Sequence, residues 1–284
     1  MNRKIFLQNL LLLGVTPYLL KANPYPLMNP KISVQLLRHA TLIIHIGKQK
    51  LLVDPMLASK GELDPVQNCG NNIRIPMVDL PLEKDALQKI LSEVDAIVVT
   101  HLHRDHWDLA AQTLINKDKL IFCQPSDLDK IKKQGFTNVT PIDQQLIWKD
   151  IKIFRTKGKH GSGEIGQKMG EVSGFVFASK QQSVYLAGDT IWCDDVNEAL
   201  KEHQPTAIIV NAGGAQFLSG GPITMTPEDI RQVYAKQPNA KIIAVHMDTV
   251  NHCFVKRTAL RKALQENNLV SKVIIPFDGD LIPL

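Results

Sequence analysis

The run Thr100–His106 constrains this chain more than any other stretch of its sequence. Four of its seven positions can ligate a metal ion, namely His101, His103, Asp105 and His106. Imidazole nitrogen and carboxylate oxygen are the ligands that zinc and similar divalent ions take in proteins, and so dense a cluster is hard to explain by packing. The run follows Ala96–Val99, an apolar stretch rich in β-branched residues that predicts a buried strand. The sequence therefore predicts a metal site on a loop leaving the end of a strand, where a rigid scaffold holds the ligands.

Length and composition are those of an ordinary globular protein. The chain has 284 residues, of which 44% are hydrophobic and 21% are charged, and it shows no internal repeat, low-complexity tract or convincing linker. These properties predict one large domain, which we place at residues 32–284. The four cysteines are widely spaced and form no C-x-x-C pair, which disfavours a cysteine-based zinc site and leaves their pairing open.

The net charge of +5 is only mildly basic. Arg3, Lys4 and Lys21 lie in the first 22 residues, which contain no acid, so the rest of the chain carries a net charge of +2. No stripe of Lys and Arg with interleaved aromatic residues follows, as nucleic-acid binding would require. We therefore expect a small-molecule substrate and no nucleic-acid partner; the oligomeric state stays open.

Residues 1–22 have the pattern of a bacterial signal peptide or N-terminal anchor. Arg3 and Lys4 give a positive start, Ile5–Leu20 is uncharged and mostly apolar, and Pro24 follows shortly after. The apolar stretch is shorter than the roughly 20 residues that span a bilayer. We expect an exported, periplasmic protein that meets a membrane only through an uncleaved leader. The alternative is an ordinary amphipathic helix on a cytoplasmic protein.

The order of the predicted elements indicates a layered α+β fold. Strands are expected at residues 32–37, 41–46, 50–54, 96–99, 119–123, 145–148, 151–156, 172–179, 183–187, 207–211, 241–246 and 272–276. Helices are expected at residues 82–91, 109–115, 126–134, 195–203, 226–236 and 256–266, with Ser126 and Thr226 as N-caps. Antiparallel strands with helices to cover them favour sheets packed face to face with the helices outside. Residues 59–82, rich in Gly, Pro, Asn and Asp, are expected to form a long irregular loop.

Three further ligand candidates stand just after predicted strands. They are His160, beside Gly161; Asp189, beside Gly188; and His246. Alone, each would be interpreted as a hydrogen-bonded structural residue. Their shared placement at strand ends, like that of the histidine-rich run, is what makes them candidates for the same site.

The order H-x-H-x-D-H, then His, then Gly-Asp-Thr, then His resembles the metallo-β-lactamase superfamily of metal-dependent hydrolases, from about Val34 to the C-terminus. The segments 39–41 (His-Ala-Thr) and 52–55 (Leu-Val-Asp-Pro) are similar to the opening hairpin of one branch of it. That branch contains L-ascorbate-6-phosphate lactonase and the N-acyl-phosphatidylethanolamine phospholipases. The resemblance implies the metallo-β-lactamase fold, a single-domain αββα four-layer sandwich with metals at one edge.

Two divalent ions are implied by position, Zn²⁺ foremost and Mn²⁺ as the alternative. The implied ligands are His101, His103 and His160 for one ion, Asp105, His106 and His246 for the second, and Asp189 as the bridge. Two such ions would clamp a shared hydroxide that attacks the substrate. The residues expected to be catalytic are Asp105, Asp189 and His252, the last as proton donor to the leaving group, although a polar surface residue is the alternative for His252.

Several neighbouring residues are expected to support the site. Candidates for orienting ligand histidines are Asp54, Thr100 and Thr190. His39 is expected to support the site and not to ligate a metal. Trp107 and Trp192 either wall the cleft or pack in the core, and residues 211–217 either line the substrate pocket or form a tight loop.

The leading interpretation is a binuclear metal-dependent hydrolase that cleaves a small ester, with a lactone as first choice. One alternative is a phospholipase D-like phosphodiesterase of the same superfamily, and another is an iron-dependent redox member. A binding protein with an inactive site is disfavoured, because the implied ligand set is complete.

Overall fold

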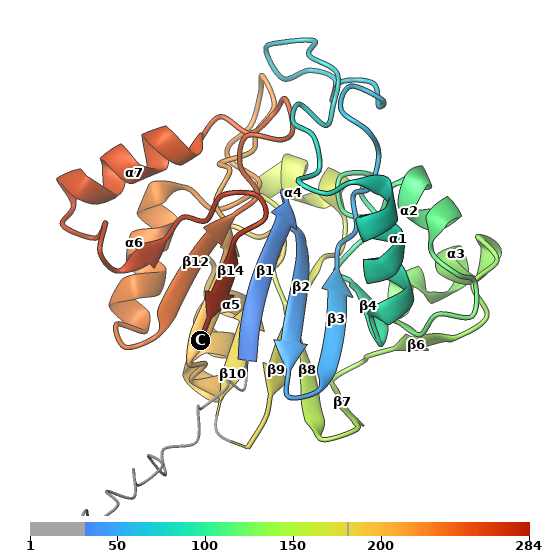
Figure 1. Ribbon diagram of the computed structural model, residues 1–284. Coiled ribbons are helices and arrows are strands. Elements are labelled where there is room, and N and C mark those ends of the chain that lie inside the picture. Colours follow the sequence, from blue (N-terminus) through green and yellow to red (C-terminus); the bar gives the residue numbers. More distant parts are fainter. Residues whose placement is uncertain (1–31, 181) are drawn as a thin grey trace, which may run out of the picture.

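Two β-sheets packed face to face form the centre of the protein (Figure 1). The computed structural model describes residues 32–180 and 182–284, so the leader predicted at residues 1–22 lies outside the described residues. The first sheet contains, from edge to edge, β14 (Leu281–Pro283), β1 (Ile32–Arg38), β2 (Thr41–Ile46), β3 (Gln49–Val53), β4 (Ala96–Val99), β5 (Ile121–Cys123) and β6 (Val139–Pro141). The second contains β13 (Val273–Ile274), β12 (Lys241–Val245), β11 (Ala207–Asn211), β10 (Ser183–Leu186), β9 (Ser173–Ala178), β8 (Ile151–Lys157) and β7 (Gln145–Trp148).

Parallel pairing dominates one half of each sheet. Strands β3, β4, β5 and β6 run parallel to one another, as do β10, β11, β12 and β13. Strands of such sheets are covered on both faces and are therefore continuously apolar. This explains why the unbroken apolar runs at β4 and β11 are fully buried.

The apolar core between the sheets joins residues of both. The first sheet contributes Val34, Leu42 and Val53, and the second contributes Phe177, Leu186 and Ile209. All are buried in one cluster, so the two sheets are held together by the hydrophobic effect over their whole contact area.

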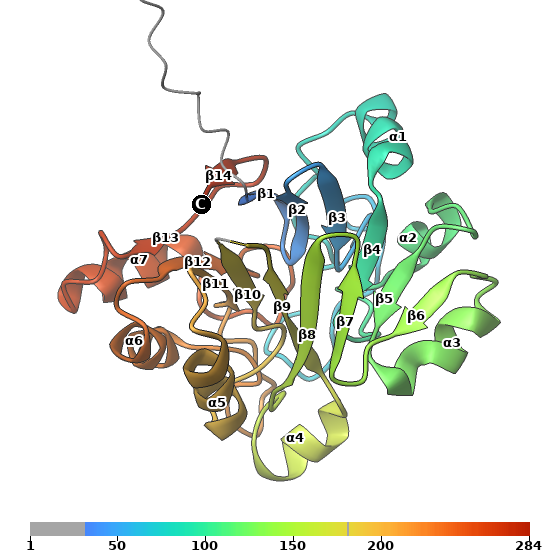
Figure 2. The ribbon, with the colours of Figure 1, turned by 90° about the horizontal axis from the view of Figure 1, so that it is seen from below.

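Helices cover the outer face of each sheet. On the first sheet lie α1 (Lys84–Glu93), α2 (Leu109–Leu114) and α3 (Leu128–Lys133), and on the second lie α5 (Asp194–His203), α6 (Pro227–Lys236) and α7 (Arg257–Glu266). A further helix, α4 (Gly163–Met169), follows β8. Figure 2 shows the two helical layers on opposite sides of the sheets. The predicted αββα four-layer sandwich is therefore confirmed.

The predicted elements are present, with small shifts at their ends, but four details differ. Three elements were not predicted: β6 and β14 are very short, and α4 contains two glycines, which lower helix propensity. The predicted helix at 126–134 starts with a 3₁₀ turn, Pro125–Asp127, and α3 begins only at Leu128. Pro125 suits the first position of a helical turn, so Ser126 lies inside that turn and is not the N-cap of α3.

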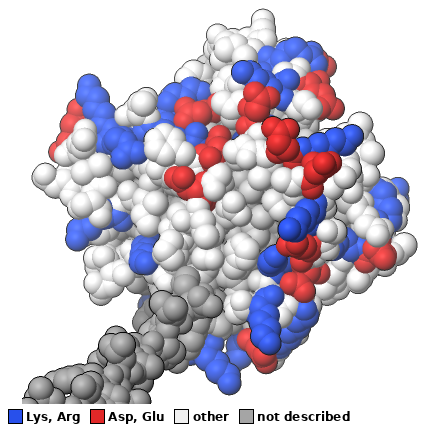
Figure 3. All heavy atoms as spheres, in the orientation of Figure 1, with Lys and Arg blue, Asp and Glu red and all other residues white. Residues whose placement is uncertain are grey.

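Charged side chains are mixed in sign on the face of the molecule shown in Figure 3, where Lys and Arg lie next to Asp and Glu. That face carries no extended basic patch. In the part of the chain that the structure describes, no helix has the length and apolar character needed to cross a membrane.

Thr226 is the N-cap of α6, as predicted. Its hydroxyl accepts a hydrogen bond from the Asp229 amide (3.3 Å), and the Asp229 carboxylate accepts one from the Thr226 amide (2.8 Å). Thr226→Ala should lower the free energy of unfolding by about 1 kcal/mol in urea titrations, because the Asp229 N–H loses its acceptor and the Asp229 carboxylate loses the donor hydroxyl. Thr226→Ser keeps the hydroxyl and should match the wild type; equal stability of both variants would contradict the cap.

Candidate metal centre

The predicted ligands all lie where strands end at one edge of the sandwich. In the first sheet β1, β3 and β4 run in the same direction, and in the second β8, β10 and β12 do so. The carboxyl ends of strands that run together meet at one edge of a sheet. The residues that follow these ends are His39, Asp54, His101, His160, Asp189 and His246.

Three histidines form the first group. The Nδ1 atom of His103 lies 3.0 Å from Nε2 of His101 and 3.2 Å from Nε2 of His160. All three nitrogens lie within 4.8 Å of one another, close enough to bind one ion. This is the set expected for the first metal.

The second group contains two histidines and an aspartate. Nε2 of His106 lies 3.1 Å from Nε2 of His246, and these nitrogens lie 3.8 and 3.6 Å from Oδ2 of Asp105. His39 joins the group, with its Nε2 3.3 Å from the same carboxylate oxygen. The three residues expected for the second metal therefore converge.

Asp189 lies between the two groups. Its Oδ2 is 3.2 Å from Nε2 of His106 and 3.5 Å from Nε2 of His160, while its Oδ1 is 3.3 Å from Nε2 of His246. Asn211 holds the carboxylate by donating to Oδ1 at 2.6 Å. The structure thus brings together all seven side chains that the sequence put forward as ligands, with Asp189 in contact with both groups.

Hydrogen bonds on their outer nitrogens set the tautomers of His101 and His106. Nδ1 of His106 lies 2.9 Å from the Asp54 carboxylate, which can only accept. The Thr100 hydroxyl donates to the same carboxylate at 2.7 Å, so it accepts from Nδ1 of His101 at 3.0 Å. Each Nε2 atom therefore presents a lone pair to the cluster. The supporting roles proposed for Asp54 and Thr100 fit these contacts.

His160 follows the same rule, since its Nδ1 donates to the carbonyl of Ile223 at 2.8 Å. His246 has the thiol of Cys253 3.5 Å from its Nδ1. The Nε2 lone pairs of His106 and His160 thus face the Asp189 carboxylate at 3.2 and 3.5 Å, an arrangement that is repulsive without shared positive charge. This donor set fits divalent metal ions, and imidazole with carboxylate suits zinc, manganese and iron alike.

The pKa shifts of the clustered residues also indicate a site that favours positive charge. Burial disfavours a charged His106, but Asp189, Asp105 and Asp54 outweigh it and raise the pKa of His106 to about 10. Burial alone would raise the pKa of Asp189, yet the neighbouring histidines lower it well below its usual range. The Asp105 and Asp189 carboxylates, whose pKa values are both lowered, are therefore ionised, and the site favours positive charge, whether a proton or a metal supplies it.

Three residues at this edge have left-handed backbone conformations. The φ angles are 60° at His39, 42° at Asp54 and 67° at His246. Such conformations cost of order 1 kcal/mol for residues other than glycine. The surrounding structure holds them in place, in part because the His246 amide donates to the His39 carbonyl at 3.0 Å and so joins the two sheets.

His39 differs from the neighbouring ligand candidates in one respect. Its Nδ1 is enclosed and has no hydrogen-bond partner among the described residues, whereas a ligand histidine normally donates its outer N–H to an acceptor. A donor at Nε2 pointing to Asp105 satisfies the ring better than a metal bond would. The geometry favours the supporting role expected for His39.

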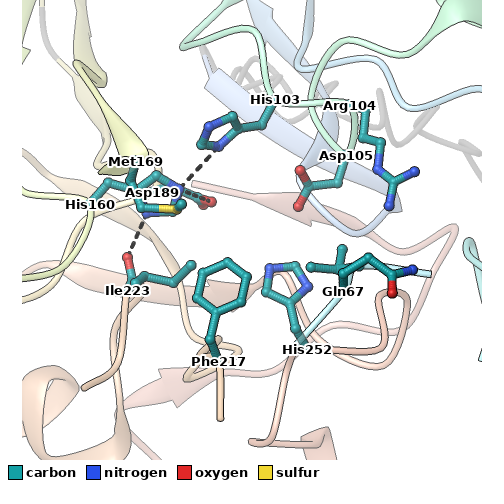
Figure 4. Close-up of a pocket in the computed structure, with 11 residues that line it drawn as sticks. Gln67, His103, Arg104, Asp105, His160, Met169, Asp189, Phe217, Ile223 and His252 are labelled. Carbon is teal, nitrogen blue, oxygen red and sulfur yellow. Dashed lines mark hydrogen bonds and ion pairs between the residues drawn. The ribbon is translucent and has the colours of Figure 1, made fainter. Parts of the chain in front are cut away.

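A cleft of about 590 Å³, its open mouth included, leads to the cluster (Figure 4). The ligand candidates His103, Asp105, His160 and Asp189 face it on one side. His252 lies on the opposite side beside Phe217, whose ring centroid is 6.0 Å away. The remaining lining residues are Val66, Gln67, Arg104, Met169 and Ile223.

Some residues put forward near the site lie elsewhere. Thr190 accepts from the Lys159 amide at 2.9 Å and so supports the chain beside His160, and among the described residues the other partners of its hydroxyl are Ile191 and Cys193. Trp107 packs on Phe136 and Trp192 on the core beneath the second helical layer, so neither lines the cleft. The four cysteines are free thiols.

Other residues of the site were not singled out from the sequence. Asn211, which holds Asp189, belongs to the segment 211–217 expected to line the pocket or form a tight loop, and Phe217 of that segment lines the cleft. The carbonyl of Ile223 carries no side-chain signal. Val66 and Gln67 lie in the irregular loop, where only its length pointed to a function.

Comparison with known proteins gives consistent matches. The family described as Beta-lactamase superfamily domain matches residues 51–247. The UPF0173 protein YddR of Bacillus subtilis (strain 168) is 38% identical over 253 residues, covering 88% of this chain and 98% of YddR. A solved possible metal-dependent hydrolase from Veillonella parvula is 39% identical, with a TM-score of 0.85, over 89% of this chain and 99% of that one. An isothiocyanate hydrolase from Delia radicum gut bacteria is 35% identical, with a TM-score of 0.84 and the same coverage.

The hydrogen bond between His39 and Asp105 should strengthen metal binding, and two substitutions of His39 test this. His39→Gln keeps an N–H group that can reach Asp105, whereas His39→Leu removes it, and both place a side chain on the same strained backbone. We expect His39→Leu to weaken metal binding by about 10–100-fold and His39→Gln to weaken it only slightly. Bound metal measured against graded chelator is the readout. Equal weakening in both variants would contradict the hydrogen bond.

Proposed function

The chain belongs to the β-lactamase superfamily and, within it, to the UPF0173 family of metal-dependent hydrolases, and we propose that it hydrolyses a small uncharged substrate at an electrophilic carbon. The first substrate class is the isothiocyanates, R–N=C=S, because the isothiocyanate hydrolase is 35% identical and similar in structure. The second is the lactones put forward from the sequence, whose carbonyl carbon is open to the same attack.

The observation that carries this proposal is the mixed lining of the cleft. The ligand candidates His103, Asp105, His160 and Asp189 line the cleft together with four apolar residues, Val66, Met169, Phe217 and Ile223. Met169 and Ile223 lie beside His160, so apolar surface directly adjoins the ligand candidates (Figure 4). Apolar walls favour an uncharged substituent, and the few polar groups then orient the reacting atoms. A substrate bound in this way would have its electrophilic carbon next to the ligand cluster.

The alternatives remain distinguishable. Arg104 is the one permanent cation among the described residues that line the cleft, so the protein offers little for a phosphodiester beyond the metals themselves. Iron would suit the same ligands, so a redox activity is separated by metal analysis. We also propose that the protein is exported to the periplasm, and this part of the proposal depends on residues 1–22.

The residues that would hold two ions are the two groups described above, with Asp189 between them. Bound divalent ions, zinc first and manganese second, would supply hydroxide at neutral pH and stabilise developing negative charge. Asp54 and Thr100 would keep His101 and His106 in the tautomers that binding requires, and Asn211 would hold Asp189 in place.

His252 is the residue that we propose for handling a proton at the substrate. Its Nδ1 is enclosed without a partner among the described residues, which leaves Nε2 as the atom that can reach the cleft. Burial lowers the pKa of His252 to about 4, and nearby cations would lower it further, so the ring is neutral at pH 7. We therefore assign it a neutral N–H donor role and not that of an imidazolium acid.

Isothiocyanate hydrolysis needs a hydrogen-bond donor near the nitrogen that leaves as the amine. The water oxygen bonds to the central carbon, both water protons pass to nitrogen, and the C–N bond breaks to release RNH₂ and O=C=S. An N–H group on His252 can hydrogen-bond the nitrogen as its negative charge grows. For a lactone the same group would face the ring oxygen that leaves.

Activity assays with the metal-loaded protein test the proposal directly. We expect amine release from benzyl isothiocyanate, loss of turnover with EDTA, and a decrease in kcat/KM of at least about 100-fold in Asp189→Ala with the fold retained by circular dichroism. Asp150→Ala, at an exposed position, is the control and should match the wild type. Panels of lactones and phosphodiesters run alongside; turnover of phosphodiesters alone, or activity that resists EDTA, would refute the proposal.

The assignment of His252 predicts a particular pH dependence. His252→Ala should lower kcat about 100-fold without changing metal content, and His252→Gln, which keeps an N–H group, should lower it less. The kcat profile between pH 5 and 8 should keep its shape in His252→Ala, because a group with a pKa of about 4 stays neutral over this range. Loss of an inflection near pH 6.5 in that variant would show an imidazolium acid instead.

A further inference from the structure

The loop between β3 and α1 lies over the edge at which the ligands gather (Figure 1). Between Val53 and Lys84 the structure has neither helix nor strand, only an isolated bridge from Leu63 to Ile75. Two residues of this loop, Val66 and Gln67, line the cleft. A loop with so little regular structure needs other contacts to form a defined wall.

Those contacts centre on the side chain of Asn251. Its Oδ1 accepts from the Val66 amide at 2.9 Å, and its Nδ2 lies 3.0 Å from the Val66 carbonyl, 3.1 Å from the Asn71 carbonyl and 2.8 Å from Sγ of Cys69. Asn71 returns a bond from its Nδ2 to the Asn251 carbonyl at 2.9 Å. Asn251 is 3% exposed. Its buried amide therefore holds the loop from Val66 to Asn71 through hydrogen bonds that are shielded from water.

The segment Asn251–His252 also holds the wall of the cleft that contains Phe217. His252 follows Asn251 directly and lines the cleft, and its carbonyl accepts from the Gln216 amide at 3.0 Å, next to Phe217. The Leu218 amide in turn donates to the Asn68 carbonyl at 2.7 Å. The cleft walls formed by the loop, by Phe217 and by His252 are therefore tied to one another around Asn251.

We propose that Asn251 is a positioning residue that sets the width of the cleft at its Val66 wall and thereby selects substrates by the size of their substituent. This inference rests on the proposed function, since it concerns the same site. Among the described residues, the hydrogen bonds of the Asn251 side chain go to Val66, Cys69 and Asn71 and to none of the seven ligand candidates. Substitution of Asn251 should therefore change substrate binding and leave the two groups of ligand candidates intact.

The choice of variants follows from the contacts. Asn251→Asp keeps an acceptor for the Val66 amide but faces the Val66 and Asn71 carbonyls with a second oxygen, and Asn251→Ala removes every bond. Val66→Ala widens the wall directly without disturbing Asn251, so it tests the same idea if the Asn251 variants fold poorly. Asn267→Ala, at an exposed position of α7's C-cap, is the matched control.

The experiment compares kcat/KM for methyl, butyl, hexyl and phenethyl isothiocyanate in the metal-loaded proteins, with bound metal and amide hydrogen exchange measured on the same samples. We expect the ratio between large and small substrates to shift by about tenfold in both Asn251 variants and in Val66→Ala, mainly through KM. Exchange protection of the Val66 amide should fall in Asn251→Ala, while metal content and the behaviour of Asn267→Ala stay at wild-type values.

The outcomes separate this inference from the proposed function. Wild-type protein that turns over neither isothiocyanates nor lactones refutes the function, and the inference with it. An active wild type whose size selectivity persists in Asn251→Ala and Val66→Ala refutes the inference alone. Loss of bound metal in Asn251→Ala would also overturn it, because Asn251 would then be needed for the whole site and not for its width.

Discussion

The carboxylate of Asp54 is the contact on which the rest of the site depends. It accepts hydrogen bonds from the Thr100 amide and hydroxyl and from Nδ1 of His106. Through Thr100 it also orients His101. One buried acid at the end of β3 therefore sets the tautomers of a histidine in each ligand group.

Gathering the ligand candidates at one edge requires strained backbone conformations, which the packing of the fold stabilises. His39, Asp54 and His246 each hold a left-handed backbone conformation, which strand-to-loop turns of this tightness require. Strained residues persist only where packing overdetermines them. The core between the sheets provides that packing, because it fixes the strands from which these turns emerge.

Much of the fold and of the ligand cluster was predictable from the sequence, for identifiable reasons. Apolar runs such as Ala96–Val99 are buried on both faces and leave a strong local signal, and a polar residue directly after such a run marks a strand end. The resemblance to the metallo-β-lactamase superfamily then grouped distant residues such as His160 and His246. Short strands such as β6 and β14 carry too few residues for a periodic pattern, and they form only because neighbouring strands offer hydrogen bonds.

The sequence by itself determined which side chains can bind metal and that each stands at the end of a strand, because ligand chemistry and apolar runs are local properties of the chain. Only the tertiary structure decided that these residues meet in space, which hydrogen bonds orient them, and which loops close the cleft around them. The contacts of His39 with Asp105, of Asn211 with Asp189 and of Asn251 with the loop at Val66 join residues far apart in the chain. No local pattern encodes such pairs, since they exist only once the two sheets have packed together and brought their strand ends to one edge.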